Sequence, residues 1–385
     1  MPRVLIVRGQ LVTPWELRPW AELPERYDVS YLLTRSNAFD ATSLPLRAEP
    51  VTALRDRFPA GPIGSVAAGV IGERYLADAD AAYATADIVH AEELSFWFAA
   101  DAARRKAKHG YRLVQTVWET LPFMHTFRNR HARRYRQEVL AATDLFLPAT
   151  ERARQALLLE GVEDERISVC PPGIDVGRFG RRATAPATEH VILSPGRLVW
   201  EKGHQDVLRA VALLAREGQY PRVRIVGRGP EEGRLRAYAR ELGIDDRVEI
   251  GALPYDEMPQ AFASASCMVL ASLPLASAQL HPFDLPRAFW EEQFGLVLAE
   301  SMAAGLDLLA SESGAIPEVL DGQGTLFAPG DWPRLARLLR EGPLGRPPGE
   351  RVVYPREQVE LFSTPAAAGR LAAAYDRLLS GALAR

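Results

Sequence analysis

Two glutamates in the second half of the chain, Glu292 and Glu300, stand eight positions apart, and an aromatic residue and a glycine lie between them. Phe294 and Gly295 predict a loop that brings backbone close to a ligand, and the Leu- and Ala-rich run 296–304 predicts a helix. The first N–H groups of a helix lack intrahelical partners, and such an end attracts a diphosphate. On that geometry both carboxylates could reach hydroxyl groups of one bound molecule. The alternative is a pair of solvated surface glutamates.

A second segment with chemical potential, Ser194–Gly203, joins an expected strand to an expected helix. It carries two cations, Arg197 and Lys202, and Lys202 is the only lysine in the C-terminal half of the chain. A diphosphate leaving group develops negative charge as its bond to a sugar breaks, and cations on a glycine-flanked backbone stabilise that charge. The alternative is a surface loop with two solvated cations.

Together these segments resemble the retaining, nucleotide-sugar-dependent glycosyltransferases of family four, which have the two-domain GT-B fold. The first segment matches the family's E-x7-E motif, and the second matches its G-R-L-x-x-x-K-G pattern. The following Gly305-Leu306 and the run Ala310–Val319 also match. The resemblance covers nearly all of the second half of the chain with ordered motifs, and the first half only in layout.

The resemblance implies a role for each residue of a donor site. Glu292 would contact hydroxyls of the donor sugar and Glu300 the ribose, while Arg197 and Lys202 would hold the diphosphate. A G-x-G-x-x-G dinucleotide fingerprint would need a glycine at position 232, where the chain has Glu232, so NAD binding is disfavoured. The nucleobase would meet backbone in Gly251–Pro254. The implied donor-binding set is Arg197, Lys202, Gly227, Leu253, Pro254, Glu292, Phe294, Gly295, Leu296 and Glu300.

The acceptor side is less well marked. Two segments, Ile88–Glu92 and Thr116–Thr120, end expected strands, so their polar residues should face a ligand. The family commonly has a histidine in the second segment, where this chain has Trp118-Glu119. Glu119 therefore becomes the candidate that contacts the acceptor or the donor sugar, and a buried, hydrogen-bonded glutamate is an equal alternative. The acceptor-side candidates are Thr13, His90, Trp118, Glu119 and Arg134, and the catalytic candidates are Glu292, Lys202, Arg197 and Glu119.

Three further patterns have weaker functional readings. A basic cluster on an expected helix, between Arg128 and Arg136, could meet an anionic acceptor or an acidic membrane surface, although a solvated face is the favoured alternative. The loop 273–290 is longer than the family usually has, and its His281, Asp284 and Arg287 could cover the donor sugar. Asp78-Ala79-Asp80 lies in an alanine-rich helical run, Arg74–Ala86, where carboxylates usually face water, so we reject it as a metal site. The basic cluster comprises His125, Arg128, Arg130, His131, Arg133, Arg134 and Arg136.

The elements that must position these residues alternate between strand and helix in both halves, which predicts two parallel sheets covered by helices, each Rossmann-like. We expect an N-terminal domain at 1–172, a linker at 173–189, a donor-binding domain at 190–360 and a C-terminal helix, 361–385, that crosses back to the first domain as in the family. The expected strands are 4–7, 29–33, 88–90, 113–117, 145–148, 167–170, 191–193, 223–226, 248–250, 268–271 and 308–310.

Composition is that of a globular protein, with 385 residues, 47% of them hydrophobic and 25% charged. The net charge of −3 disfavours bulk nucleic-acid binding. The two cysteines, Cys170 and Cys267, suggest neither a disulfide framework nor a zinc site. Since no apolar run is long enough to span a membrane and the N-terminus reads as a strand, we expect a cytoplasmic protein, in possible peripheral contact with the inner face of the membrane.

The sequence therefore predicts transfer of a sugar from a nucleoside-diphosphate sugar to a glycan, lipid or small-molecule acceptor. Retention of the anomeric configuration and independence of metal and cofactor are implied by the resemblance. An epimerase or hydrolase acting on sugar nucleotides is the nearest alternative, and a donor-binding protein without catalysis is the second. An inverting enzyme would need a positioned base such as Glu119.

Overall fold

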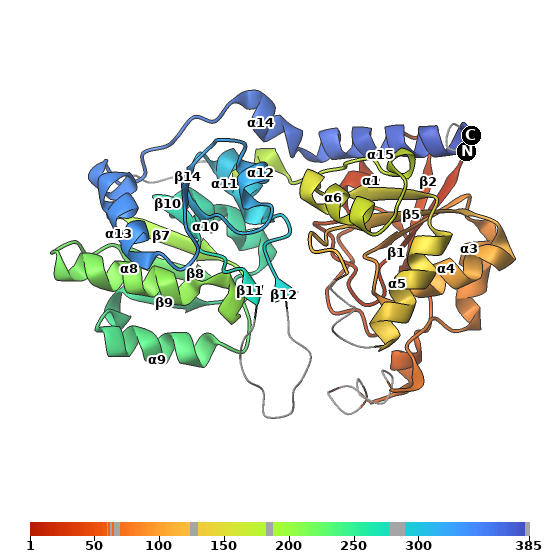
Figure 1. The fold of residues 1–385 in the computed structure, drawn as a ribbon, viewed down its shortest axis with the longest axis horizontal. Coiled ribbons are helices and arrows are strands. Elements are labelled where there is room, and N and C mark those ends of the chain that lie inside the picture. Colours follow the sequence, from red (N-terminus) through yellow and green to blue (C-terminus); the bar gives the residue numbers. More distant parts are fainter. Residues whose placement is uncertain are drawn as a thin grey trace. The chain divides into compact units, whose positions relative to one another are not determined.

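The computed structural model describes residues 1–59, 61, 64, 70–123, 130–181, 188–276 and 289–381. The chain forms two compact units. Unit 1 contains residues 1–173 and the helix that begins at Thr364, and unit 2 contains residues from Ile174 to Ser363. Each unit is built on its own six-stranded parallel sheet, as the alternation of strands and helices predicts (Figure 1).

The sheet of unit 1 has the strand order β3-β2-β1-β4-β5-β6, and all its pairings are parallel. Parallel strands all end at the same edge of a sheet, so the loops that follow them gather there. The strands are β1 (Arg3–Val7), β2 (Asp28–Leu33), β3 (Arg47–Pro50), β4 (Ile88–Glu92), β5 (Arg112–Val117) and β6 (Leu145–Pro148).

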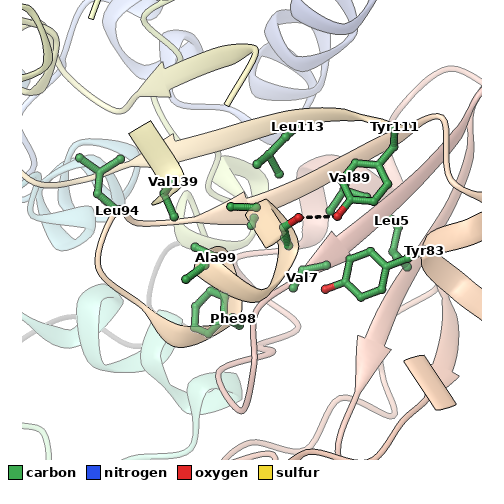
Figure 2. Close-up of a cluster of buried hydrophobic side chains, with 14 of the residues drawn as sticks. Leu5, Val7, Tyr83, Val89, Leu94, Phe98, Ala99, Tyr111, Leu113 and Val139 are labelled. Carbon is green, nitrogen blue, oxygen red and sulfur yellow. Dashed lines mark hydrogen bonds between the residues drawn. The ribbon is translucent and has the colours of Figure 1, made fainter. Parts of the chain in front are cut away.

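Helices cover both faces of this sheet because its strands are apolar on both sides. One face packs against α3 (Asp80–Thr85), α4 (Trp97–His109) and α5 (Arg130–Ala142), and Figure 2 shows the resulting core, with Phe98 and Tyr111 among its large side chains. The Tyr111 hydroxyl donates a hydrogen bond to the Ala102 carbonyl of α4 there. The remaining elements are α1 (Arg18–Ala21), α6 (Glu151–Leu159) and the short 3-10 helices η1 (Leu54–Arg57), η2 (Ala77–Ala79) and η4 (Asp164–Arg166).

The C-terminal helix α15 (Thr364–Leu379) packs on the opposite face of the unit 1 sheet. It lies beside α1, and the Trp20 indole N–H donates a 2.8 Å hydrogen bond to the Tyr375 hydroxyl (Figure 1). The Tyr27 hydroxyl donates to Asp376 at 2.5 Å. The helix is thus part of the first unit's core, although it is last in the sequence.

Unit 2 repeats the arrangement with the strand order β14-β13-β10-β7-β8-β9. Here β7 (Val191–Pro195) is central, and the residues that follow it form the glycine-containing turn identified above. The other strands are β8 (Arg222–Val226), β9 (Val248–Gly251), β10 (Cys267–Leu270), β13 (Asp307–Ser311) and β14 (Thr325–Phe327). A separate antiparallel pair, β11 (Leu275–Ala276) and β12 (Phe289–Trp290), joins the two ends of the long loop.

The helices of unit 2 also lie on both faces of the sheet (Figure 1). One set, α8, α9 and α13, buries the apolar stripe predicted around Val207, Val211 and Leu214. The motif helix α11 packs with α7, α10 and α14. The bounds are α7 (Val176–Phe179), α8 (His204–Arg216), α9 (Glu232–Leu242), α10 (Met258–Ser264), α11 (Leu296–Ala304), α12 (Ile316–Leu320), α13 (Trp332–Glu341) and α14 (Arg356–Leu361), with 3-10 helices η5 (Trp200–Lys202), η6 (Asp245–Arg247), η7 (Tyr255–Glu257) and η8 (Pro343–Gly345).

Several expected elements differ from the structure. The strand predicted at 167–170 is an extended segment beside β6 that forms an isolated bridge at Ile167, with further N–H bonds from Ser168 and Cys170 to β6 carbonyls. Pro171 and Pro172 follow and cannot donate, so the pairing does not continue. The edge strands β3 and β14 lack the apolar alternation that would predict them. The range expected to be a linker contains α7, whose Phe179 is fully buried in unit 2.

The run Arg74–Ala86 is helical only from residue 77 to residue 85. Within it, Asp80 is only half-buried, but its carboxylate is engaged by neighbouring cations instead of being solvated alone. Its carboxylate accepts from Lys108 at 2.7 Å and from His109 at 3.1 Å, and it also pairs with Arg105. These three partners hold the pKa of Asp80 below its ordinary value, led by the bond from Lys108. The aspartate therefore joins α3 to α4.

Candidate active site

The two motifs of unit 2 meet in one ion pair. The ammonium of Lys202 lies 2.6 Å from Oε2 of Glu292, and both side chains are largely buried. The same carboxylate oxygen accepts a 2.7 Å hydrogen bond from the hydroxyl of Ser272, at the end of β10. The Lys202 ammonium also lies 5.0 Å from the centre of the Trp290 ring, in cation–π geometry. Ninety residues of sequence separate the pair, so only the fold brings these charges together.

Backbone geometry fixes the position of Lys202, the last residue of η5 in the turn after β7. Gly203 follows it with φ +67°, and a Cβ atom there would lie 1.8 Å from the Ala271 carbonyl oxygen, so no other residue fits. His204 opens α8, and its ring nitrogens contact the Ser194 hydroxyl at 2.9 Å and the Arg197 carbonyl at 3.1 Å. Burial lowers the pKa of His204 to about 4. His204 is thus neutral, and its two contacts stabilise the turn from inside.

A second glycine-containing turn, after β8, packs directly on the first. A Cβ atom at Gly227 would lie 1.8 Å from the Gly196 carbonyl oxygen, and one at Gly229 would lie 2.2 Å from the Leu198 carbonyl oxygen. The Leu198 N–H donates to the Arg228 carbonyl at 2.9 Å. Gly227 therefore permits a close approach of two backbones, which shapes the turn that carries Arg197 and Lys202.

The helix predicted after Glu292 is present as α11, Leu296–Ala304, with Gly295 as its N-cap at φ +78°. Glu292 itself is held through its backbone, since its carbonyl accepts from the Ala315 N–H at 2.8 Å and its N–H donates to the Ser313 hydroxyl at 3.3 Å. The first N–H groups of α11 have no acceptor within the helix, and its positive end begins four residues after Glu292.

Glu300, the second acid of the motif, is buried in the middle of α11, and burial raises the pKa of its carboxyl to about 8. Arg178 of α7 opposes that rise from a distance. Arg178 donates to Asp256 at 2.6 Å and to the Tyr255 carbonyl at 3.1 Å. A buried carboxyl in this state is mostly protonated at neutral pH and can donate as well as accept a hydrogen bond.

The other donor-side candidates lie in more open positions. The Arg197 guanidinium is 61% exposed and lies 3.8 Å from Glu201, so it is available to a ligand at little cost. Leu253 is half-buried and lines a cavity of about 390 Å³ between β8, β9 and α10, whereas Pro254 is exposed. Gly251 and Ala252, from the stretch expected to meet the nucleobase, line the same cavity.

In unit 1 a buried charge network occupies the edge where β1 and β4 end. Arg8 donates to Glu16 at 2.7 Å and pairs with Glu92, and the Trp118 indole N–H donates to the same Glu92. The Thr13 hydroxyl also donates to Glu16, at 2.7 Å. Burial raises the pKa of Glu92 to about 7, against the opposing charge of Arg8. Two of the acceptor-side candidates, Thr13 and Trp118, thus belong to one network.

Glu119 is buried, and its Oε2 accepts from Arg136 at 3.2 Å. Arg136 also pairs with Glu160, whose carboxylate accepts from the Phe123 N–H at 3.0 Å. The prediction that Arg136 belongs to an exposed basic cluster is therefore wrong, because this position of α5 faces inward. Burial lowers the pKa of its guanidinium. Arg134 is exposed and pairs with Glu138 at 2.7 Å, while Arg128 and His125 lie outside the described residues.

His90 is an internal residue. Its Nδ1 lies 2.6 Å from the Tyr375 hydroxyl and its Nε2 lies 2.8 Å from the Thr116 hydroxyl. The Trp20 indole N–H donates to the Tyr375 hydroxyl, which leaves the tyrosine proton available to His90 Nδ1; in that arrangement the His90 proton lies on Nε2. Burial lowers the pKa of His90 to about 3, so it stays neutral and joins α15 to the sheet.

Sequence reasoning missed Ser272, Trp290, Arg178 and Arg8, and it marked Glu92 only as one of the polar residues of the segment Ile88–Glu92. Ser272 and Trp290 lie at the ends of short strands outside any motif, and no local pattern marks them. Arg8 follows β1 directly, so the rule that strand ends carry ligands, which marked the segment of Glu92 at the end of β4, could have found it too. The lid candidates His281, Asp284 and Arg287 lie outside the described residues.

Among the described residues, no helix is long and apolar enough to cross a membrane.

Two family models match the chain in succession. Residues 22–178 match the model described as "Glycosyltransferase Family 4", and residues 178–342 match "Glycosyl transferases group 1". Among curated relatives, the D-inositol 3-phosphate glycosyltransferase of Acidothermus cellulolyticus is 31% identical over 230 residues, which cover 53% of this chain and 48% of the relative. The chain spans about half the length of the curated relatives it matches.

Solved structures share the fold over almost the whole chain. The Anabaena protein HepE, in complex with UDP and glucose, has a TM-score of 0.74 at 18% sequence identity. The match includes 98% of this chain and 99% of the HepE chain. Sucrose-phosphate synthase from Thermosynechococcus elongatus has a TM-score of 0.72 at 17% identity, with 99% and 100% coverage. Two helix-covered parallel sheets and these likenesses define a protein with the GT-B fold.

Within that class, the ordered matches to both models settle the family. The chain belongs to the group 1 glycosyltransferases of the family-four kind. The GT-B fold predicted from the sequence is confirmed. The role of each site residue stays a prediction.

Proposed function

We propose that the protein transfers a hexosyl group from a nucleoside-diphosphate sugar to an acceptor, with retention of configuration and without a metal ion. The observation that carries the proposal is the buried Lys202–Glu292 pair, 2.6 Å apart, just ahead of the N-terminus of α11. The complexes of HepE with UDP and with UDP-glucose support a nucleotide-sugar donor on this fold.

The pair suits a leaving group that gains charge. Without a ligand, Lys202 is neutralised by Glu292, and Ser272 holds the carboxylate from the other side. A donor diphosphate placed against Lys202 and the first N–H groups of α11 would meet positive potential from both. As the bond from the sugar to the diphosphate breaks, charge grows on the phosphate oxygen, and a fixed ammonium stabilises that state more than the ground state.

Glu292 would keep a second role in this arrangement. Ser272 and the backbone bonds to Ser313 and Ala315 fix its position, so a free acceptor site on the carboxylate can orient a sugar hydroxyl. Arg197, largely exposed, would move to the diphosphate. Glu300 would hold the ribose through its carboxyl, and the backbone at Gly251–Leu253 would meet the base.

Glu119 supports retention over inversion. An inverting transferase needs an accessible general base, and Glu119 is buried and already paired with Arg136. Its proposed part is to shape the acceptor side, together with Thr13, Trp118 and the network around Glu92. A glycan, a lipid or a small molecule is the acceptor class, and a cytoplasmic location belongs to the same proposal.

Incubation of the protein with sugar nucleotides, with and without candidate acceptors, tests the proposal. A thermal-shift screen across UDP, GDP, ADP and dTDP and their sugars selects the donor first. The expected result is release of the nucleoside diphosphate that depends on the acceptor. The NMR spectrum of the product should show the same axial or equatorial linkage at the anomeric carbon as the donor has. Release or epimerisation that needs no acceptor would favour an epimerase or hydrolase, and tight binding with no turnover would favour a donor-binding protein.

A further inference from the structure

A cavity of unit 2 lies away from the candidate active site, at the edge of the sheet where β7 and β8 begin. Its volume is about 270 Å³, and it is lined by the segment ahead of β7, the turn between α8 and β8, and residues in and after η8. Since β7 and β8 run parallel, this edge is opposite to the one where Lys202 lies in the turn after β7. We call it the strand-start cavity.

Backbone hydrogen bonds fix both sides of the strand-start cavity. On one side Gly218, at φ +85°, ends the turn after α8, and the Gln219 N–H donates to the Leu214 carbonyl at 2.9 Å, as in a Schellman motif. On the other side the His190 carbonyl accepts from the Arg222 N–H at 2.9 Å, which ties the segment ahead of β7 to β8. The side chains that line the cavity therefore start from fixed backbone positions.

Two buried polar atoms of the lining have no hydrogen-bond partner within the described chain. They are Oε1 of Gln219 and Nδ1 of His190. Buried donors and acceptors are nearly always paired, because an unpaired one costs free energy that a hydrogen bond from a ligand would recover. Two such atoms in the lining of one cavity indicate a site for a polar ligand.

The charges of the lining disfavour an ionic ligand. Burial lowers the pKa of His190, so its ring is neutral at neutral pH, with one nitrogen that donates and one that accepts. Among the described residues of the lining, Glu189 is the only carboxylate, and it pairs with Arg222 at 2.5 Å. None of these lining residues is a lysine or an arginine, so a phosphate group would meet no cation in the cavity.

Apolar side chains complete the lining. The Tyr220 side chain is 60% exposed, so its ring lies at the opening of the cavity. Arg247 holds this tyrosine, since its guanidinium lies 5.9 Å from the ring centre and donates to the Tyr220 carbonyl at 3.3 Å. Leu344 and Pro348 lie on the η8 side. An aromatic ring beside unpaired polar atoms suits a ligand that has both an apolar face and hydrogen-bonding groups.

We propose that the strand-start cavity binds one neutral sugar ring of a glycan. The face of a pyranose carries C–H groups that would pack on Tyr220, and its rim carries hydroxyl groups. A hydroxyl both donates and accepts, so it can pair with Oε1 of Gln219 and with Nδ1 of His190 in either tautomer. A purely apolar ligand would leave both atoms unpaired, and a sugar nucleotide would need more than the range of about 300–1,000 Å³ begins with and a cation for its phosphates. The cavity would bind its sugar without a nucleotide, so the proposal does not rest on the proposed transfer.

Saturation-transfer-difference NMR of the full chain, without nucleotide, tests the proposal. The probes are the methyl glycosides of glucose, galactose, mannose and N-acetylglucosamine, and at least one should bind. Gln219→Leu and Tyr220→Ser should each raise its dissociation constant about tenfold, because the first removes a hydrogen-bond acceptor and the second removes the ring. Tyr220→Phe keeps the ring and should bind within about twofold of wild type.

Gln323 provides a matched control in the same unit. It too follows a glycine with positive φ, Gly322 at +77°, just after the helix α12, and it does not line the cavity. Gln323→Leu should leave the dissociation constant within about twofold of wild type, because the change lies outside the site. Gln219→Leu should melt no lower than wild type, since it removes a buried acceptor that has no partner in the free protein. Loss of binding in that variant is then not a loss of folding.

Three results would overturn the proposal. The first is that none of the four glycosides binds, or that the cavity variants and Gln323→Leu change binding equally. The second is binding that Glu292→Gln abolishes and the cavity variants keep, because the sugar would then lie in the candidate active site. The third is displacement of the glycoside by an equal concentration of adenosine, since a planar base would then be the better occupant.

Discussion

Replacement of Glu300 by glutamine gives a sharp test of how unit 2 holds its buried acid. Burial raises the pKa of this carboxyl from an ordinary 4.5 to about 8, so the folded protein binds its proton more tightly than the unfolded chain does. The contribution of Glu300 to the free energy of unfolding is therefore fully present below pH 4.5 and is lost as the pH rises toward 8. At about 1.4 kcal/mol per pH unit, the full loss is about 5 kcal/mol.

Glutamine mimics the protonated carboxyl and cannot ionise. The two proteins should thus be equally stable at pH 5, and Glu300→Gln should be more stable at pH 8.5. The figure of about 5 kcal/mol is an upper limit, because water penetration and movement of Arg178 relieve part of the penalty. Even about 2 kcal/mol would raise the melting temperature of a unit of this size by several degrees.

Scanning calorimetry at pH 5 and pH 8.5 measures the difference, with attention to the transition of unit 2 because the two units can unfold separately. Glu241→Gln on α9 is the matched control, since that side chain is exposed in the same unit. It should show no pH-dependent gain. A stability difference between wild type and Glu300→Gln that is the same at both pH values would refute the reasoning, as would a variant that is less stable at pH 8.5.

Three more substitutions probe other parts of the molecule. Lys202→Met leaves Glu292 buried without its cation, so it should lower the free energy of unfolding by about 3 kcal/mol and turnover at least a hundredfold. The double variant Lys202→Met/Glu292→Gln should regain stability but should not regain turnover in the donor assay. Gly203→Ala should cost several kcal/mol in calorimetry, or prevent folding, because its Cβ would overlap the Ala271 carbonyl, whereas Gly243→Ala, at φ +69° with open space around it, should cost about 1 kcal/mol. Tyr375→Phe strands two buried ring nitrogens and should lower stability by about 2 kcal/mol, read as a lower melting temperature of unit 1.

The candidate donor site was predictable where the sequence carries a local constraint. Gly203 and Gly227 are required by backbone contacts shorter than any side chain tolerates, so the glycines themselves mark the turns. Lys202 is conspicuous in a chain that otherwise uses arginine in its C-terminal half. The helix after Gly295 follows from its composition. These features depend on neighbours in sequence, which is why a pattern captures them.

What could not be predicted depends on long-range packing. Ser272, whose hydroxyl donates to the same Glu292 oxygen as Lys202, is a strand-end residue with no motif around it. Arg136 looks like its neighbours Arg133 and Arg134 in the sequence, and only the position of α5 on the sheet sends it inward to Glu119. The small edge strands carry too few residues for an alternation to appear.

The two sheets share one architecture, yet their charged edges differ in a way that favours unit 2 for the diphosphate of the proposed donor. In unit 1 the buried charges at the strand ends are mostly acidic, which would repel a phosphate in a medium of low dielectric constant. In unit 2 the ammonium of Lys202 and the guanidinium of Arg197 lie in the turn after β7, and α11 begins four residues after Glu292. The acidic edge of unit 1 pairs Arg8 and Arg136 with Glu16, Glu92, Glu119 and Glu160. An acceptor hydroxyl carries no charge, so in the proposed function an acidic edge would suit the acceptor, whereas it would repel a second diphosphate.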